Sequence, residues 1–259
     1  LFKGYLPEQI NTELPTNKLK KETFKNTLLH NKHEIAAIIL EPLVQCAGGF
    51  KFHSRETLKF IDDLAKENNI LIIADEIATG FGRTGSMFAF EQSKIKPDII
   101  CLGKALTGGT ISLAAVVANS KIYDSFLSDN DEDALMHGPT YMANPLACSA
   151  ANASIDLFRT EPRLEQVKNI EKELNNKLIE CKNMKSVIDV RVKGALGVIQ
   201  VKKMHNLNWL RKKFVEDGVW IRPFLDVIYI MPSFTISNAE ITKLTESIIN
   251  IIPEWECKF

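Results

Sequence analysis

The stretch Ile70-Leu-Ile-Ile-Ala-Asp75 is a short apolar run that ends on a carboxylate, and the stretch Ile99-Ile-Cys-Leu-Gly-Lys104 is a second one that ends on a lysine. Short, continuous apolar runs are typical of strands that are buried on both faces of a sheet. Ligands of open α/β sheets bind at the carboxyl ends of the strands. The two runs therefore predict two strands, one crossover unit apart, with Asp75 and Lys104 at the ligand-binding ends.

This pair of side chains suits the chemistry of a pyridoxal phosphate enzyme. The amine of Lys104 can form a Schiff base with the aldehyde, and the carboxylate of Asp75 can keep the pyridine nitrogen protonated, so that the ring accepts electrons. Burial would disfavour the charge of Lys104 and make its amine a nucleophile and a proton-transfer base. Ile77 projects to the same side as Asp75 and either packs against a cofactor ring or belongs to an ordinary core.

Composition and charge limit the partners, the cellular location and the metal sites that we expect for this protein. The 259 residues include 32 basic and 32 acidic side chains, so the net charge is zero and neither nucleic acid nor a membrane is expected as a partner. The five cysteines are scattered and odd in number, which indicates a reducing, cytoplasmic location. His30-x-x-His33 with Glu34 lacks a further convergent ligand, so we expect no metal site. The chain does not begin with Met, and we expect it to start within a longer sequence.

The pattern along the chain predicts two regions. Strands and helices alternate up to about residue 155, which indicates an α/β layer with a mainly parallel sheet. Short strands beside amphipathic helices follow, so we expect a second, α+β domain at 156–259. The expected helices are 55–67, after a cap at Ser54, then 144–158, 163–183 and 238–251. The expected strands are 34–40, 70–75, 99–104, 112–118, 188–192, 197–201, 220–221 and 227–231.

Three further motifs allow more than one interpretation. Gly80-Phe-Gly-Arg-Thr-Gly85 matches a dinucleotide-binding pattern, but the acid at the preceding strand end would repel a pyrophosphate, so a tight active-site loop is favoured. His137-Gly-Pro-Thr140 could hold a phosphate through the Thr140 hydroxyl and backbone N–H groups, or form a routine turn. Arg222 lies among apolar residues and, if buried, needs a carboxylate or phosphate partner. That partner could belong to a bound ligand or, with equal weight, could be Glu41 or Asp226 in a structural ion pair.

Two long motifs resemble a known family. The stretches Ala74–Gly85 and Pro97–Gly109 resemble the signature of the class III pyridoxal phosphate aminotransferases, which have fold type I, and the resemblance covers nearly the whole chain. It implies a fold type I α/β architecture, with a partial cofactor-binding large domain at 1–155 and a small α+β domain at 156–259. The resemblance departs at Cys46 and Ala143, where members of the family usually have glycine.

The resemblance also implies a role for individual residues. Lys104 and Asp75 would be catalytic and would bind the cofactor together with Ile77. Pro139 and Thr140 would contact the cofactor phosphate across the interface of a homodimer. The substrate would be bound by Lys104, Gly138 and Arg222. Glu41 lies where related enzymes place a glutamate that can pair with such an arginine.

Met136–Cys148 and Val219–Phe224 point to a narrower branch of the family. They resemble the enzymes of biotin biosynthesis that convert 8-amino-7-oxononanoate to 7,8-diaminononanoate with S-adenosylmethionine as amino donor. Members of the family also carry an additional amino-terminal segment with a phosphate-binding Gly-Ser turn and aromatics around the ring, which this chain does not contain. Two alternatives stay open, namely another class III ω-amino-acid aminotransferase and an inactive truncated fragment.

Overall fold

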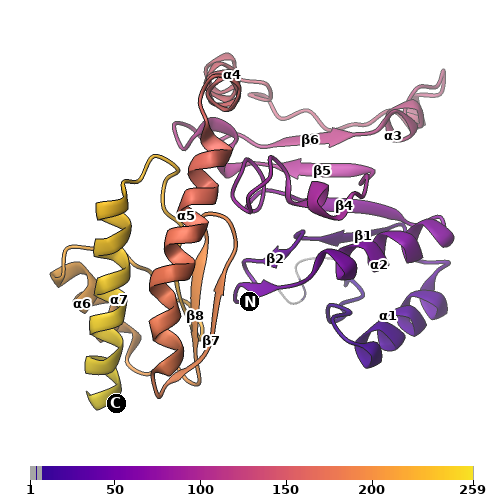
Figure 1. The fold of residues 1–259 in the computed structure, drawn as a ribbon. Coiled ribbons are helices and arrows are strands. Elements are labelled where there is room, and N and C mark those ends of the chain that lie inside the picture. Colours follow the sequence, from indigo (N-terminus) through magenta and orange to yellow (C-terminus); the bar gives the residue numbers. More distant parts are fainter. Residues whose placement is uncertain (1–3, 5–7, 259) are drawn as a thin grey trace.

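The large sheet of the molecule has four strands. The computed structural model describes residue 4 and residues 8–258. The strands are β1 (Ala37–Leu40), β4 (Leu71–Asp75), β5 (Ile99–Leu102) and β6 (Ala115–Ala118), in the spatial order β1-β4-β5-β6 (Figure 1). β1, β4 and β5 are parallel, and β6 is antiparallel to β5. The predicted mainly parallel sheet is therefore confirmed.

Helix α2 (Arg55–Glu67) shows how the sequence builds this layer. The hydroxyl of Ser54 accepts a hydrogen bond from the Thr57 amide at 3.1 Å and caps the helix, as predicted. The apolar residues of α2 recur at helical spacing and are buried with those of α1 (Lys18–Asn31) in one core. That core joins α1 and α2 to β1 and β4.

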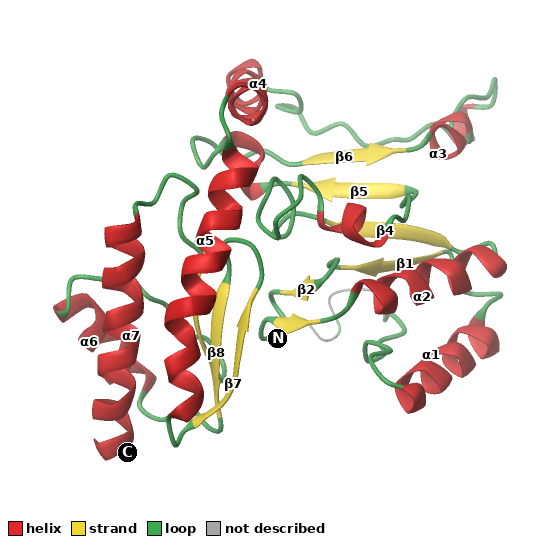
Figure 2. Ribbon diagram, in the orientation of Figure 1, coloured by secondary structure: helices red, strands yellow, loops and turns green. Residues whose placement is uncertain are grey.

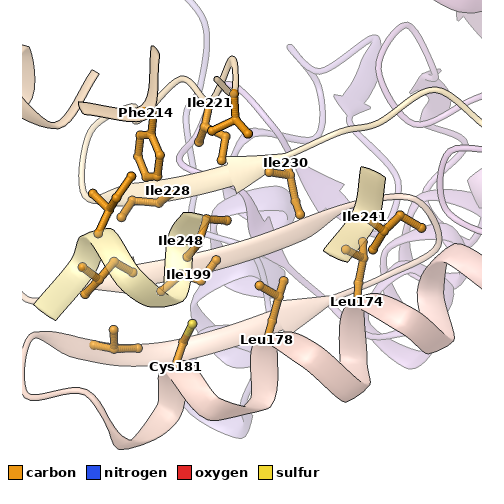
Figure 3. Close-up of a cluster of buried hydrophobic side chains, with 14 of the residues drawn as sticks. Leu174, Leu178, Cys181, Ile199, Phe214, Ile221, Ile228, Ile230, Ile241 and Ile248 are labelled. Carbon is orange, nitrogen blue, oxygen red and sulfur yellow. The ribbon is translucent and has the colours of Figure 1, made fainter. Parts of the chain in front are cut away.

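The carboxyl-terminal part is a three-stranded antiparallel sheet with helices packed beside it. Its strands are β7 (Val187–Val192), β8 (Gly197–Val201) and β9 (Val227–Ile230), in that order. Figure 2 shows the helices α5 (Arg163–Leu178), α6 (Leu207–Glu216) and α7 (Asn238–Lys258) beside β7 and β8. Apolar side chains of these elements, among them Leu174, Ile199, Phe214, Ile228 and Ile248, form one buried cluster (Figure 3).

Helix α4 (Pro145–Thr160) links the two parts. Its Ser154 hydroxyl donates to the carbonyl of Ala105, which anchors the helix on the 3-10 turn η2 (Lys104–Thr107). The predicted domain boundary at 155/156 falls inside α4 and stays a prediction. The remaining short elements are β2 (Val44–Gln45), β3 (Lys51–Phe52), η1 (Ala89–Ser93), α3 (Ser120–Asp124), η3 (Asp131–Asp133) and η4 (Ile179–Asn183).

Two sequence-based expectations for the carboxyl-terminal part were wrong, and one helix was not predicted. The strand expected at 220–221 does not form; residues 219–224 alternate between buried and exposed, but Pro223 has no N–H to donate to a ladder. Helix α6 was not predicted. Helix α7 continues past Pro253 to Lys258, because the buried Trp255 packs in the core and its indole N–H donates to the His205 carbonyl at 2.7 Å.

Arg83 joins the two parts of the molecule. Its guanidinium donates to the carbonyls of Ala195 and Pro232, both at 2.8 Å, and lies 4.6 Å from the centre of the Phe234 ring. The backbone N–H of Ala195 in turn donates to the Arg83 carbonyl at 3.0 Å. Burial lowers the pKa of Arg83 to about 10. The glycine loop after β4 is therefore held tightly against the turn before β8.

We predict that Gly194→Ala destabilises the protein much more than Gly218→Ala. Both glycines have positive φ, but a Cβ at Gly194 would lie 2.4 Å from the Arg83 carbonyl oxygen, whereas nothing lies within 4 Å of one at Gly218. The left-handed conformation alone costs about 1–2 kcal/mol for an alanine, and the clash adds to that cost. Urea unfolding of both variants measures the difference, and equal losses would contradict the close contact.

Candidate active site

The pairing of β4 with β5 sets the positions of Asp75 and Lys104. Asp75 lies opposite Cys101 in the parallel register, and the Glu76 amide donates to the Cys101 carbonyl at 3.0 Å. Lys104 follows β5 after a single intervening glycine, at the start of η2. Both side chains therefore belong to the carboxyl ends of adjacent strands, which is the ligand-binding edge of such a sheet.

The Asp75 carboxylate is partly held by its own chain. Its Oδ1 accepts a hydrogen bond from the Ile77 amide at 3.1 Å, and Oδ2 has no hydrogen-bond partner among the described residues. Burial raises the pKa of the neighbouring Cys101 thiol, and the negative charge of Asp75 adds to the effect. The carboxylate is thus fixed in orientation with one oxygen available to a donor.

Lys104 has a strained backbone. Its φ is 45°, in the left-handed region that residues other than glycine rarely adopt. The side chain is exposed, so the expectation of a buried lysine was wrong. The physical reason is that no described residue covers the Lys104 side chain, although the backbone at the neighbouring Gly103 is buried.

Ile77 lies next to Gly103. A Cβ added at Gly103 would be 3.4 Å from Ile77 Cγ2, which is ordinary van der Waals contact. Ile77 is half-buried rather than part of the fully buried core. Its aliphatic side chain therefore lines the site between the ends of β4 and β5.

Glu41 and Cys46 face the same region from the end of β1. Glu41 Oε2 accepts a hydrogen bond from the Cys46 amide at 2.6 Å. Burial raises the pKa of the Cys46 thiol to about 12, and the Glu41 charge acts in the same direction. The positive charges of Lys104 and Arg83 act on the same thiol in the opposite direction. Because the charges of Glu41, Arg83 and Lys104 all act on the Cys46 thiol, these four residues lie close to one another.

Glu76 is a buried structural residue that the sequence analysis did not identify. It is fully buried, and its carboxylate accepts from the Thr79 hydroxyl at 2.7 Å and from the Phe90 amide at 2.9 Å. Since successive strand residues point to opposite faces, its place directly after Asp75 was the available signal. Together with Arg83, Glu76 anchors the glycine loop to the rest of the structure.

The segment with Gly138, Pro139 and Thr140 has no hydrogen bond or ion pair to Asp75 or Lys104 among the described residues. In Figure 1 the chain runs out to α3 and returns to α4 through this segment, and all three residues are exposed. A Cβ at Gly138 would meet nothing within 4 Å. Ala143, near the start of α4, has a φ of 55°, a conformation that favours glycine. Nothing in the described residues holds these side chains near the strand ends.

Arg222 is exposed, so it does not need the partner that a buried arginine would require. Within the described part of the chain it has no ion pair; Asp226 instead accepts from the Gln200 amide at 2.7 Å, and Glu41 is bound to the Cys46 amide. The alternating burial of residues 219–224 puts Arg222 on the solvent side of an extended segment. Its guanidinium is therefore available to an external carboxylate.

Neither a metal site nor a membrane helix is found in the described residues. Residue 4 and residues 8–258 contain no group of three or more His, Cys, Asp or Glu side chains placed to hold a metal ion. None of the helices in that part of the chain has the length and apolar character that crossing a membrane requires.

We predict that Glu76→Gln reduces the loss of stability with rising pH. Burial raises the pKa of Glu76, so the folded protein holds this proton more tightly than the unfolded chain does. That contribution is complete below the ordinary glutamate pKa and is lost as the pH rises through the raised value, at about 1.4 kcal/mol per unit. The oxygen of the glutamine amide can accept from the Phe90 N–H, and its NH2 group can donate to the Thr79 hydroxyl, which then acts as the acceptor.

The test is the free energy of unfolding from pH 4 to pH 8, measured for wild type and variant. Glu67→Gln, at an exposed carboxylate, is the control with the same change of charge. The wild type should lose stability relative to Glu76→Gln as the pH rises, and parallel curves would contradict the assignment.

Comparisons with known proteins agree with this architecture. The family model described as "Aminotransferase class-III" matches residues 2–252. The adenosylmethionine-8-amino-7-oxononanoate aminotransferase of Buchnera aphidicola (subsp. Acyrthosiphon pisum) is 44% identical over 99% of this chain and 61% of the relative. The crystal structure of the enzyme of that name from Methanocaldococcus jannaschii superposes with a TM-score of 0.87 at 32% identity, over 93% of this chain and 58% of the other.

A structure of Plasmodium falciparum ornithine delta-aminotransferase is also similar, with a TM-score of 0.82 at 30% identity over 92% of this chain and 61% of that one. The fold is that of the fold type I pyridoxal phosphate aminotransferases. The chain belongs to the class III aminotransferases, a pyridoxal phosphate-dependent family. It spans 61% of the length of the Buchnera relative.

Proposed function

We propose that this chain forms the lysine-bearing part of an aminotransferase that converts 8-amino-7-oxononanoate to 7,8-diaminononanoate with S-adenosylmethionine as amino donor, a cytoplasmic step of biotin biosynthesis. The observation that carries the proposal is the pair of adjacent strand ends with Asp75 and Lys104 in a class III chain. The substrates are inferred from the names of relatives such as the Buchnera enzyme. Residues 1–155 would be the cofactor-binding part and residues 156–259 the small domain.

The residues at the strand ends fit the cofactor of the family. When bound, pyridoxal phosphate supplies an aldehyde that condenses with amines and a pyridinium ring that withdraws electrons from the reacting carbon. The site offers an amine at Lys104 for the aldehyde and a carboxylate at Asp75 with one oxygen free for a ring N–H. Ile77 is aliphatic and half-buried, so its side chain can pack against one face of a flat ring.

Lys104 would act in two ways. Its amine would hold the cofactor covalently before substrate arrives, and once released it would move the proton from the reacting carbon of the substrate. The strained backbone at Lys104 supports this role, because such strain persists where the surrounding structure imposes it and is concentrated at functional sites. Asp75 would hold the proton on the ring nitrogen through the oxygen that the Ile77 amide leaves free.

Arg222 would bind the carboxylate at the far end of 8-amino-7-oxononanoate. Trp220 and Phe224 lie on the same exposed side of the extended segment, and Trp220 is 79% exposed. A guanidinium between two aromatic side chains can form a bidentate contact with the acid while the rings contact the aliphatic chain. Glu41 would pair with Arg222 when no substrate carboxylate is present.

Gly138, Pro139 and Thr140 would act in the partner subunit of a homodimer. The exposed segment around them carries apolar side chains that are largely in solvent, with Met136 90% and Tyr141 83% exposed. Such a stretch is typical of an interface rather than a free surface. Across that interface Thr140 and Pro139 would contact the cofactor phosphate, and Gly138 would leave room for substrate.

We predict that Lys104→Ala abolishes the visible absorbance of lysine-bound pyridoxal phosphate and lowers turnover by at least about 10²-fold, because a positioned proton carrier contributes that much or more. The enzyme is assayed with the rest of the family fold supplied. Lys104→Arg, which keeps the charge, should behave like the alanine variant. Survival of both absorbance and turnover in either variant would contradict the role of Lys104.

We predict that Arg222→Ala raises KM for 8-amino-7-oxononanoate and leaves KM for its methyl ester unchanged. The guanidinium can form a charge-assisted pair only with the free acid. Steady-state kinetics with both acceptors separate recognition of the carboxylate from a general defect. An equal rise of KM for acid and ester would show that Arg222 does not recognise the acid.

The choice of amino donor distinguishes the proposed function from its main alternative. With S-adenosylmethionine as donor, 7,8-diaminononanoate should form, whereas ornithine or 4-aminobutyrate should give no product. Titration of the isolated chain with pyridoxal phosphate tests the other alternative, an inactive fragment. Tight binding by the isolated chain would show that it completes the site without further residues.

A further inference from the structure

A cavity lined by lysines lies in the carboxyl-terminal part, where the start of β7, the end of β8 and the end of α7 meet. It has a volume of about 230 Å³, and the exposed lysines Lys185, Lys202 and Lys203 line it together with His205. In Figure 1 this end of α7 is next to the label C. The turn between β7 and β8 contacts Arg83, so the lysine cavity and that contact are at opposite ends of the two strands.

Three hydrogen bonds fix the backbone around the lysine cavity. The Lys202 amide donates to the Ser186 carbonyl at 2.8 Å, which holds the segments before β7 and after β8 side by side. The Ser186 amide donates to a carboxylate oxygen of Glu256 on α7. The indole N–H of Trp255, which is buried in the core, donates to the His205 carbonyl at 2.7 Å. The lining therefore has a defined shape that does not depend on a ligand.

The ammonium groups of the lysine cavity have no acidic partner. Among the described residues, none of the three lysines forms an ion pair or a side-chain hydrogen bond. The only acidic side chain in the lining is Glu256, and it already accepts from the Ser186 amide. Three positive charges against one negative charge leave the lining with two positive charges, with His205 counted as neutral. The whole chain has no net charge, so this local excess is not a consequence of a basic composition.

The hydroxyl of Ser186 is a further donor without an acceptor. Ser186 belongs to the lining, and its Oγ atom is buried and has no hydrogen-bond partner among the described residues. Buried polar groups in native proteins nearly always have a partner, and a bound ion is one explanation for an exception. An oxygen atom of a ligand in the cavity would supply the acceptor that this hydroxyl lacks.

We propose that the lysine cavity binds the phosphate group of a small soluble molecule. A phosphate ester carries about 1.5–2 negative charges at pH 7, which matches the two positive charges of the lining. Lysine binds phosphate as a point charge and can do so from several directions. Pockets for drug-sized ligands have about 300–1,000 Å³, so the smaller volume of this cavity suits inorganic phosphate or a short phosphate ester. The proposal holds for any amino donor of the enzyme.

Titration of the isotopically labelled chain with inorganic phosphate tests the proposal. Nuclear magnetic resonance should show saturable shifts of the Ser186 and His205 amide signals and of the Trp255 indole N–H signal. Sodium chloride at the same ionic strength should not reproduce these shifts. The reporters are at the end of β7 and β8 that does not contact the large sheet, so phosphate bound near Lys104 would leave their signals unchanged.

A pair of lysine variants with the same kind of charge change provides the control. The double variant Lys202→Gln/Lys203→Gln should raise the Kd for phosphate by at least about 10-fold, because it removes two of the three ammonium groups. Lys168→Gln, at an exposed lysine of α5 outside the cavity, should leave the Kd within about 2-fold of wild type. All three lysines are exposed, so we expect both variants to fold.

Three results would overturn the proposal. The reporter signals would not shift with phosphate, or chloride would shift them equally, or the double variant would bind phosphate as tightly as Lys168→Gln does. The last two results would show a diffuse attraction of anions to surface lysines in place of a site. None of the three bears on the donor assay, so failure of this proposal is separate from failure of the proposed reaction.

Discussion

The buried guanidinium of Arg83 holds the two parts of the molecule in one arrangement. It donates to the carbonyls of Ala195 and Pro232, which belong to the turn before β8 and to the segment after β9. A hydrogen bond to a charged group contributes about 1.5–3 kcal/mol, so these two bonds favour one placement of the loop after β4 against the small sheet. Asp75 precedes that loop in β4 and the segment with Arg222 precedes β9, so the contact joins the two parts of the molecule that carry these residues.

The proposed chemistry is divided between rigid and open elements. Asp75 lies at the end of a strand and is held by the Ile77 amide, and the buried Glu76 fixes the loop that follows. Lys104 and Arg222 are exposed, as are Pro139 and Thr140. The rigid elements would orient the pyridine ring of the cofactor. The exposed residues would form their contacts only with a substrate, a second subunit or the rest of the fold.

The sequence was sufficient for the strands around the site, because continuous apolar runs and their terminal charges are local signals. The contacts of Arg83 were beyond sequence reasoning, since its acceptors lie 112 and 149 residues further along the chain. The exposure of Arg222 was also missed, because apolar neighbours in sequence can lie on the opposite side of an extended segment. Helix α7 passes Pro253 because burial of Trp255 outweighs the local preference to stop.

The central claim is that Lys104 is the residue that bonds to the cofactor. Its most direct test is reduction with borohydride after addition of pyridoxal phosphate to this chain and the remaining part of the fold, followed by mass spectrometry of the peptides. The account predicts a pyridoxyl group on Lys104 at full occupancy and none elsewhere. Labelling of another lysine in place of Lys104 would contradict it.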